Sequence, residues 1–139
     1  MKNLRDYISS LMLAFVILIT IVNLATGAWA YESKSSDVKN VRVEIMPVQM
    51  VPGQPVTFKI QMSTHSVELN YDIVKLSTLK DDMGREYQAL KWNGDPPVGH
   101  HRSGVLEFPA IAKGTKSITL YIKNIAGVPE RIFEWKLNQ

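Results

Sequence analysis

Three histidines supply the first chemistry that the sequence suggests. His65 lies in the segment THS, and His100 and His101 are adjacent in the segment GHHR. Imidazole is a common ligand of copper and zinc. Neighbouring residues of a regular strand point to opposite faces of a sheet, so His100 and His101 would bind one ion together only from a loop. His65, His100 and His101 are therefore candidate metal ligands, and copper fits better than zinc because methionines are present and cysteine is absent.

The same histidines have an interpretation that needs no metal. A neutral imidazole donates a hydrogen bond from one ring nitrogen and accepts one at the other, so it can bridge two loops. Such a bridge would pin the loop over residues 93–103 to the turn over residues 63–66. Metal ligation and loop bracing both stay open from the sequence.

Hydroxyl and carboxyl side chains offer a weaker case for catalysis. Ser103 and His101 would share one face of a strand, but no third partner or oxyanion hole accompanies them. The sequence has no G-x-S-x-G or H-E-x-x-H motif. The pair Asp81 and Asp82, followed by Gly84, is typical of a hairpin turn in which Asp caps its own backbone. We therefore expect a binding protein rather than an enzyme, with a hydrolase as the remote alternative.

Aromatic recognition is a further possibility at the loop before the histidine pair. Trp92 stands at the edge of the segment NGDPPVGHH, which is rich in Gly and Pro and predicts a loop. Together with Pro96 and Pro97, Trp92 could line a shallow binding surface at one end of the fold. Trp135, by contrast, alternates with core positions, so we expect it to pack inside the protein.

The composition narrows the class of protein. The chain has 139 residues, a formal net charge of +3 and no cysteine. This length predicts one small domain, and the missing cysteine excludes disulfides, thiolate zinc sites and blue-copper centres. Basic and acidic residues are interspersed, so we do not expect nucleic-acid binding.

The first 30 residues predict export. Lys2 and Arg5 precede an apolar stretch, and the small-residue pattern Ala28-Trp29-Ala30 follows it. These are the three parts of a signal peptide, which we expect to be cleaved after Ala30. The alternative is a retained membrane anchor through residues 7–30, because no charge lies between Asp6 and Glu32. Both interpretations place the rest of the chain in the periplasm or outside the cell.

The exported part predicts an all-β domain. We expect residues 31–40 to be a flexible leader and residues 41–139 to form a β-sandwich. Apolar and polar residues alternate through 41–47, 56–62, 66–73, 104–109, 117–124 and 131–137. This period of two is typical of half-buried antiparallel strands. Residues 76–92 predict a hairpin with its turn at 82–84, or alternatively a short helix over 76–82. We therefore predict an immunoglobulin-like antiparallel β-sandwich of seven or eight strands.

A resemblance supports this class. The segments THSVELNYD (64–72), LKDDMGREYQALKW (79–92), GHHRSGVLEFP (99–109) and GVPERIFEWKL (127–137) resemble those of a largely uncharacterised group of small exported prokaryotic domains of immunoglobulin-like type. The resemblance implies an exported β-sandwich and no established activity. It also implies a role for the histidine segments, as ligands or as loop contacts. We expect a binding domain of the cell envelope whose partner is another envelope protein or, alternatively, a copper or zinc ion.

Overall fold

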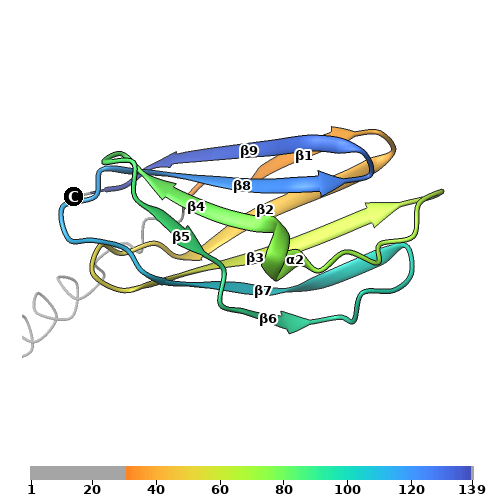
Figure 1. Cartoon of the computed structure of the whole chain (residues 1–139), viewed down its shortest axis with the longest axis horizontal. Coiled ribbons are helices and arrows are strands. Elements are labelled where there is room, and N and C mark those ends of the chain that lie inside the picture. The colour runs from red at the N-terminus through yellow and green to blue at the C-terminus, as the bar shows by residue number, and fades with distance from the viewer. Residues whose placement is uncertain (1–30, 139) are drawn as a thin grey trace, which may run out of the picture. The chain divides into compact units, whose positions relative to one another are not determined.

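Two antiparallel sheets make up the part of the protein that the structure describes (Figure 1). A computed structural model describes residues 31–138, and the predicted signal peptide or anchor at residues 1–30 lies outside the described residues. One sheet has the strand order β1 (Lys34–Val38), β2 (Val41–Gln49), β3 (Pro55–Thr64), β7 (His101–Ala110) and β6 (Lys91–Gly94). The other has the order β5 (Glu86–Gln88), β4 (Ser77–Asp81), β8 (Ser117–Ile125) and β9 (Val128–Lys136). The helix α2 (Ile73–Leu76) precedes β4, and within residues 31–138 no helix is long and apolar enough to span a bilayer.

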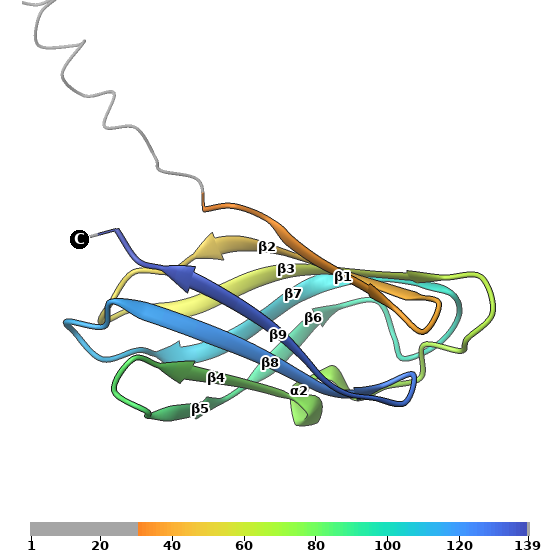
Figure 2. The same ribbon diagram turned by 90° about the horizontal axis from the view of Figure 1, so that it is seen from above.

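The alternating sequence explains why each strand has one buried face. In β2, Val41, Val43 and Ile45 are fully buried, whereas Arg42 between them is exposed. Successive side chains of a strand point to opposite sides, so this pattern turns the apolar residues toward the second sheet. Figure 2, seen from above, shows β8 and β9 lying across the strands of the other sheet.

Aromatic residues join the two layers at the centre of the core. The ring of Phe58 on β3 lies 5.2 Å from that of Trp135 on β9 and meets Phe108 edge-on at 6.0 Å. Trp135 is 3 % exposed, which confirms the prediction that it packs in the core. Such contacts add to the burial of large apolar side chains, and they hold the sandwich together without disulfides.

Two buried arginines, Arg102 and Arg131, each join a strand to another chain segment through backbone carbonyls. Arg102 on β7 donates hydrogen bonds to the carbonyl oxygens of Leu69 (3.1 Å) and Tyr71 (2.7 Å). Arg131 on β9 donates to the carbonyl oxygens of Ser36 (3.1 Å) and Val38 (2.8 Å) on β1. Burial lowers the pKa of both guanidinium groups, although nearby carboxylates partly offset this effect. Each charge is therefore held by backbone carbonyl dipoles, which point toward it from the chain segments that it joins.

Three predictions about the elements need correction. The flexible leader over residues 31–40 is wrong for residues 34–38, which form β1 and pair with β2. The described residues contain nine strands rather than seven or eight. The strand over 66–73 is also wrong, because no strand lies between β3 and α2. The chain turns there: the hydroxyl of Thr64 accepts hydrogen bonds from the amides of Ser66 and Val67, and Asp72 caps α2.

The predicted hairpin between residues 76 and 92 is confirmed. Its strands β4 and β5 pair from Thr78 to Lys80, and the turn contains Gly84 with a φ of +81°. Asp81 is buried and accepts hydrogen bonds from the amides of Met83 and Arg85, both at 2.9 Å. The carboxylate thus shapes a turn, as the sequence predicts for this segment.

Candidate functional site

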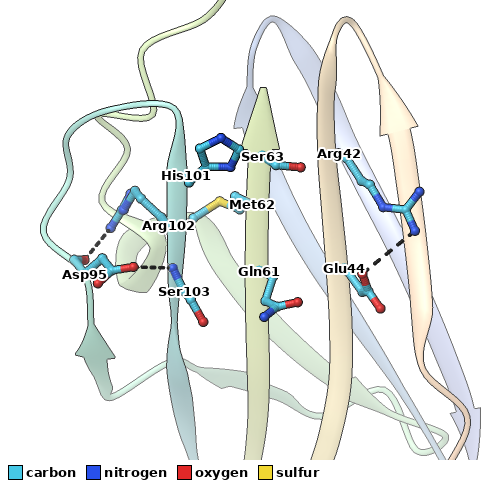
Figure 3. Close-up of a pocket in the computed structure, with 9 residues that line it drawn as sticks. All are labelled: Arg42, Glu44, Gln61, Met62, Ser63, Asp95, His101, Arg102 and Ser103. Atoms are coloured by element: carbon cyan, nitrogen blue, oxygen red, sulfur yellow. Dashed lines mark hydrogen bonds and ion pairs between the residues drawn. The ribbon is translucent and has the colours of Figure 1, made fainter. Parts of the chain in front are cut away.

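A polar depression crosses the outer face of the five-stranded sheet (Figure 3). It consists of two adjoining cavities, of about 270 Å³ and about 460 Å³, which share Arg42 and Ser63. We call the two cavities together the trough. The first is lined by Arg42, Glu44, Gln61, Met62, Ser63, Asp95, His101, Arg102 and Ser103. The second is lined by Asp37, Asn40, Arg42, Ser63, Thr64, His65 and Ser66.

The register of three neighbouring strands builds the first cavity. Arg42 on β2 pairs with Ser63 on β3, and Ser63 in turn pairs with His101 on β7. Two residues further along β2, Glu44 begins a parallel row that continues through Gln61 and Ser103. Because every second residue faces the same side, both rows share the outer face of the sheet. The floor of the trough therefore lies on regular strands, which hold its side chains in fixed positions.

A network around Asp95 forms one wall of the trough. The carboxylate of Asp95 accepts a 2.7 Å hydrogen bond from the amide of Ser103, and its own amide donates to the carbonyl of Ser103. The indole nitrogen of Trp92 donates to the carbonyl of Asp95 at 2.8 Å. Beside it, Gly94 and Gly104 pair so closely that a Cβ on Gly94 would collide with the Cα of Gly104. Glycine at both positions thus allows β6 to approach β7 here.

Backbone atoms and Arg102, rather than imidazoles, join the two loops beside the trough. The amide of Thr64 donates to the carbonyl of His100 at 3.0 Å, and the amide of Leu69 donates to the carbonyl of Gly99 at 2.9 Å. The amide of Gly99 donates to the carboxylate of Glu68 at 2.7 Å. The loops are therefore pinned together as expected. Within residues 31–138, however, the structure contains no hydrogen bond from a histidine ring to either loop.

The three histidines are separated by the fold. All three are exposed, and His101 lines the first cavity while His65 lines the second. His100 lines neither cavity, and its carbonyl takes part in the loop contact. Within residues 31–138, no three His, Cys, Asp or Glu side chains are grouped so that they could hold a metal ion. Metal binding through His65, His100 and His101 thus stays a prediction, and two of its residues lie in the trough.

The predicted aromatic surface, Trp92 with Pro96 and Pro97, lies outside the lining of the trough. Trp92 is half-buried, its ring covers Gly104, and the guanidinium of Arg102 lies 5.6 Å from the ring centroid. This geometry is a cation–π contact on a partly desolvated arginine. Pro96 and Pro97 are exposed on the loop that follows, and neither they nor Trp92 line either cavity of the trough. The indole therefore supports the wall of the trough, and a binding surface at Trp92, Pro96 and Pro97 stays a prediction.

Charges of both signs alternate along the trough. Arg42 lies where the two cavities meet; its side chain is 51 % exposed, and its guanidinium is 3.8 Å from the carboxylate of Glu44. Asp37, the cross-strand partner of Arg42 on β1, lines the second cavity, and Asp95 lines the wall of the first. Arg42 thus presents a cation between acidic groups, beside the hydroxyl of Ser63 and two imidazoles. This set of donors and acceptors suits a polar, hydrogen-bonding ligand.

The geometry gives no sign of a nucleophile and its base. Ser63 and Ser103 lie next to His101 on the outer face, but within the described residues neither hydroxyl hydrogen-bonds to an imidazole. A nucleophile needs such a bond to lose its proton to the base. The proximity of Ser103 and His101 on one face of β7, which the sequence predicts, therefore contributes polar lining to the trough.

Sequence reasoning missed Arg42, Glu44, Gln61 and Asp95. The alternation does place the first three on the polar face of their strands. It carries no information on which strands pair, and the pairing of β2, β3 and β7 is what brings these residues together. No family model, curated protein or solved structure matches the chain. The function is therefore argued from the trough itself.

Proposed function

We propose that this protein is an exported, non-enzymatic binding domain of the cell envelope, and that its trough holds a polar segment of another envelope protein. The observation that carries the proposal is the meeting of two cavities at Arg42 and Ser63 on the outer face of the sheet. A depression whose lining residues are polar apart from Met62, and lie largely on strands, is suited to recognition. Export is supported by the basic, apolar and small-residue parts of residues 1–30.

The order of the strands supports the finer, immunoglobulin-like class. With β1 and β5 taken as additions, one sheet joins the first, second, fifth and fourth strands, and the other joins the third, sixth and seventh. This is the order of an immunoglobulin constant-type sandwich. Domains of this architecture serve many unrelated functions, so the binding role depends on the trough and not on the class.

The charges of the trough suggest the chemistry of the partner. An acidic group of the ligand would pair with Arg42 and Ser63, because Arg42 is the exposed cation shared by both cavities. Basic groups on either side of it would face Asp37 and Asp95. We propose an extended segment with one acidic residue between two basic residues. Like charges at the wrong positions would be repelled, which gives the surface its selectivity.

The test is a titration of residues 31–139, a compact unit with both sheets and its own core, with synthetic peptides. Two octapeptides of equal composition are compared: one has a glutamate between two lysines, and the other has these charges permuted. We expect chemical-shift changes in the amides of β2, β3 and β7 with the first peptide only, and loss of these changes in Arg42→Glu. Lys123→Glu, on the exposed face of the other sheet, is the matched charge reversal that should bind normally. Equal behaviour of both peptides, or normal binding to Arg42→Glu, would refute the proposal.

Copper binding is the second proposal, favoured by one observation. His65 and His101 line adjoining cavities that meet at Ser63, so two imidazoles face one depression. Because His100 lines neither cavity, it is the natural control. Calorimetric titration with Cu(II), Cu(I) and Zn(II) should show binding that His101→Ala removes and His100→Ala preserves. Bound metal should be released below about pH 6, when imidazole is protonated. Absence of heat with all three ions would exclude this function.

A further inference from the structure

The first strand of the domain is held mainly by contacts to its backbone. β1 has the sequence KSSDV, and its most apolar side chain, Val38, is 46 % exposed. Arg131 binds the carbonyls of Ser36 and Val38 and the hydroxyl of Ser36, and the indole of Trp135 donates to the carbonyl of Glu32 at 2.7 Å. These contacts, together with five residue pairs to β2, would be satisfied equally by the same segment of another copy.

The connection between β1 and β2 is short and strained. Only Lys39 and Asn40 lie between the two strands, and both have a positive φ, of 54° and 60°. Two such residues make the tight turn that a two-residue hairpin requires. Asparagine tolerates this left-handed conformation better than lysine, whose Cβ crowds the backbone. If β1 and β2 straightened into one continuous strand, both residues would leave the left-handed region.

We propose that two copies of this protein exchange β1, so that each copy's β1 pairs with β2 of the other and binds Arg131 and Trp135 of that copy. The occupant is a second copy because every contact of β1 is then retained while the strain of the turn is released. Strain in a short hinge favours exchange, and an exchanged dimer is closed and symmetric. Because Asp37 and Asn40 line the second cavity of the trough, exchange would place the other copy's Asp37 there and move Asn40.

The hinge provides the first test, on residues 31–139 refolded at high concentration and analysed by size-exclusion chromatography with light scattering. Lys39→Pro cannot adopt a positive φ, so it should shift the equilibrium toward dimer by about tenfold or more. Lys39→Gly should shift it toward monomer. Ala126→Gly is the matched control: Ala126 has a φ of 54° in the turn between β8 and β9, which stays closed in both forms. Folded, monomeric Lys39→Pro would overturn the proposal.

If Lys39→Pro does not fold, a disulfide cross-link tests whether β1 is exchanged between two copies. The chain has no cysteine, so Ser35→Cys with Glu44→Cys, a facing pair of β1 and β2, introduces the only two thiols. After oxidation of the dimer fraction with the natural hinge, exchange predicts covalent dimers on a non-reducing gel. Covalently closed monomers alone, or the absence of any dimer fraction, would show that β1 stays on its own copy.

Discussion

Arg131 and Ser36 are 95 residues apart in the chain, yet the guanidinium of Arg131 donates hydrogen bonds to both the carbonyl and the hydroxyl oxygen of Ser36. One residue belongs to the edge strand of the four-stranded sheet and the other to the edge strand of the five-stranded sheet. Arg131 thus bridges two sheets that share no backbone ladder, together with the indole of Trp135, which donates to the carbonyl of Glu32. The Nε atom of Arg131 has no partner, so burial of this charge is only partly compensated.

Truncation of this side chain should weaken the fold. We expect Arg131→Ala to lower the free energy of unfolding by about 3 kcal/mol, because it leaves a cavity and removes three hydrogen bonds from a charged donor. The exposed Arg42→Ala should change it by less than about 0.5 kcal/mol. Denaturant unfolding at neutral pH measures both. A cost below about 1 kcal/mol for Arg131→Ala would mean that β1 is held by its ladder with β2 and by the contact of Trp135 to Glu32.

Acid should weaken the turn between β4 and β5. Burial raises the pKa of the Asp81 carboxyl, but hydrogen bonds from Arg85, Tyr87 and Met83 outweigh burial, so this pKa lies below its ordinary value of 3.8. A lowered pKa stabilises the folded state above the unfolded pKa, and that stability is lost as pH falls from about 4 through the folded-state value. Asp81→Asn should lower the free energy of unfolding at pH 7 by about 2 kcal/mol. It should also reduce the loss of stability between pH 7 and low pH.

The matched control for this prediction is Asp82, the exposed neighbour in the same turn. Its pKa is lowered chiefly by the amide of Lys116, which donates to the carboxylate at 2.9 Å. Asp82→Asn should therefore cost less stability than Asp81→Asn at neutral pH. Thermal melts from pH 2 to pH 7 would record both effects. Equal costs for the two variants would contradict the role assigned to the buried carboxylate.

The loop contact beside the trough should depend on Arg102 and not on the imidazoles. His101 is exposed, so His101→Ala should change the free energy of unfolding by less than about 0.5 kcal/mol in metal-free protein. Arg102→Ala should cost about 3 kcal/mol, because it removes the donor to Leu69 and Tyr71. Chemical denaturation of the two variants compares them directly. A loss above about 1 kcal/mol in His101→Ala would restore the imidazole as a loop brace.

The close approach of β6 and β7 should not tolerate a methyl group. A Cβ on Gly104 would lie 2.6 Å from the indole ring of Trp92 and 2.7 Å from the Cα of Gly94. Gly104→Ala should destabilise the domain by about 2 kcal/mol and move the indole, which Trp fluorescence would report. Gly99→Ala, where a Cβ meets no atom within 4 Å but φ is +80°, separates backbone strain from collision. Because Gly104 has no positive φ, this kind of strain does not contribute there, and a Gly104→Ala variant without measurable cost would contradict the predicted collision.

The strands with one apolar face could be predicted because burial leaves a period of two in the sequence. β2, β3, β8 and β9 follow that pattern over most of their length. The same alternation predicts a strand over residues 66–73, and this prediction is wrong. Leu69 and Ile73 are buried as expected, but the chain there is not a strand. Alternation reports which side chains turn inward, and it does not report a hydrogen-bonded partner.

β1 and the trough could not be predicted, for a shared reason. The segment KSSDV has no apolar face, and its place depends on a guanidinium from the far end of the sequence. The trough likewise depends on which strands are neighbours, since Arg42 and His101 meet only through Ser63 between them. Local pattern carries neither kind of information, because both arise from contacts between residues that are distant in the chain.

The side-chain seam between β1 and β9 also determines how the domain would respond to force. The first and last described residues adjoin, since the amide of Asn138 donates to the hydroxyl of Tyr31 at 3.1 Å. A pull that separates these two ends would load the bonds of Tyr31, then Glu32, then Ser36 in succession. These hydrogen bonds would therefore break one after another, at low force, while the central strands stay folded. Under force, β1 would therefore separate from β9 before the central strands unfold.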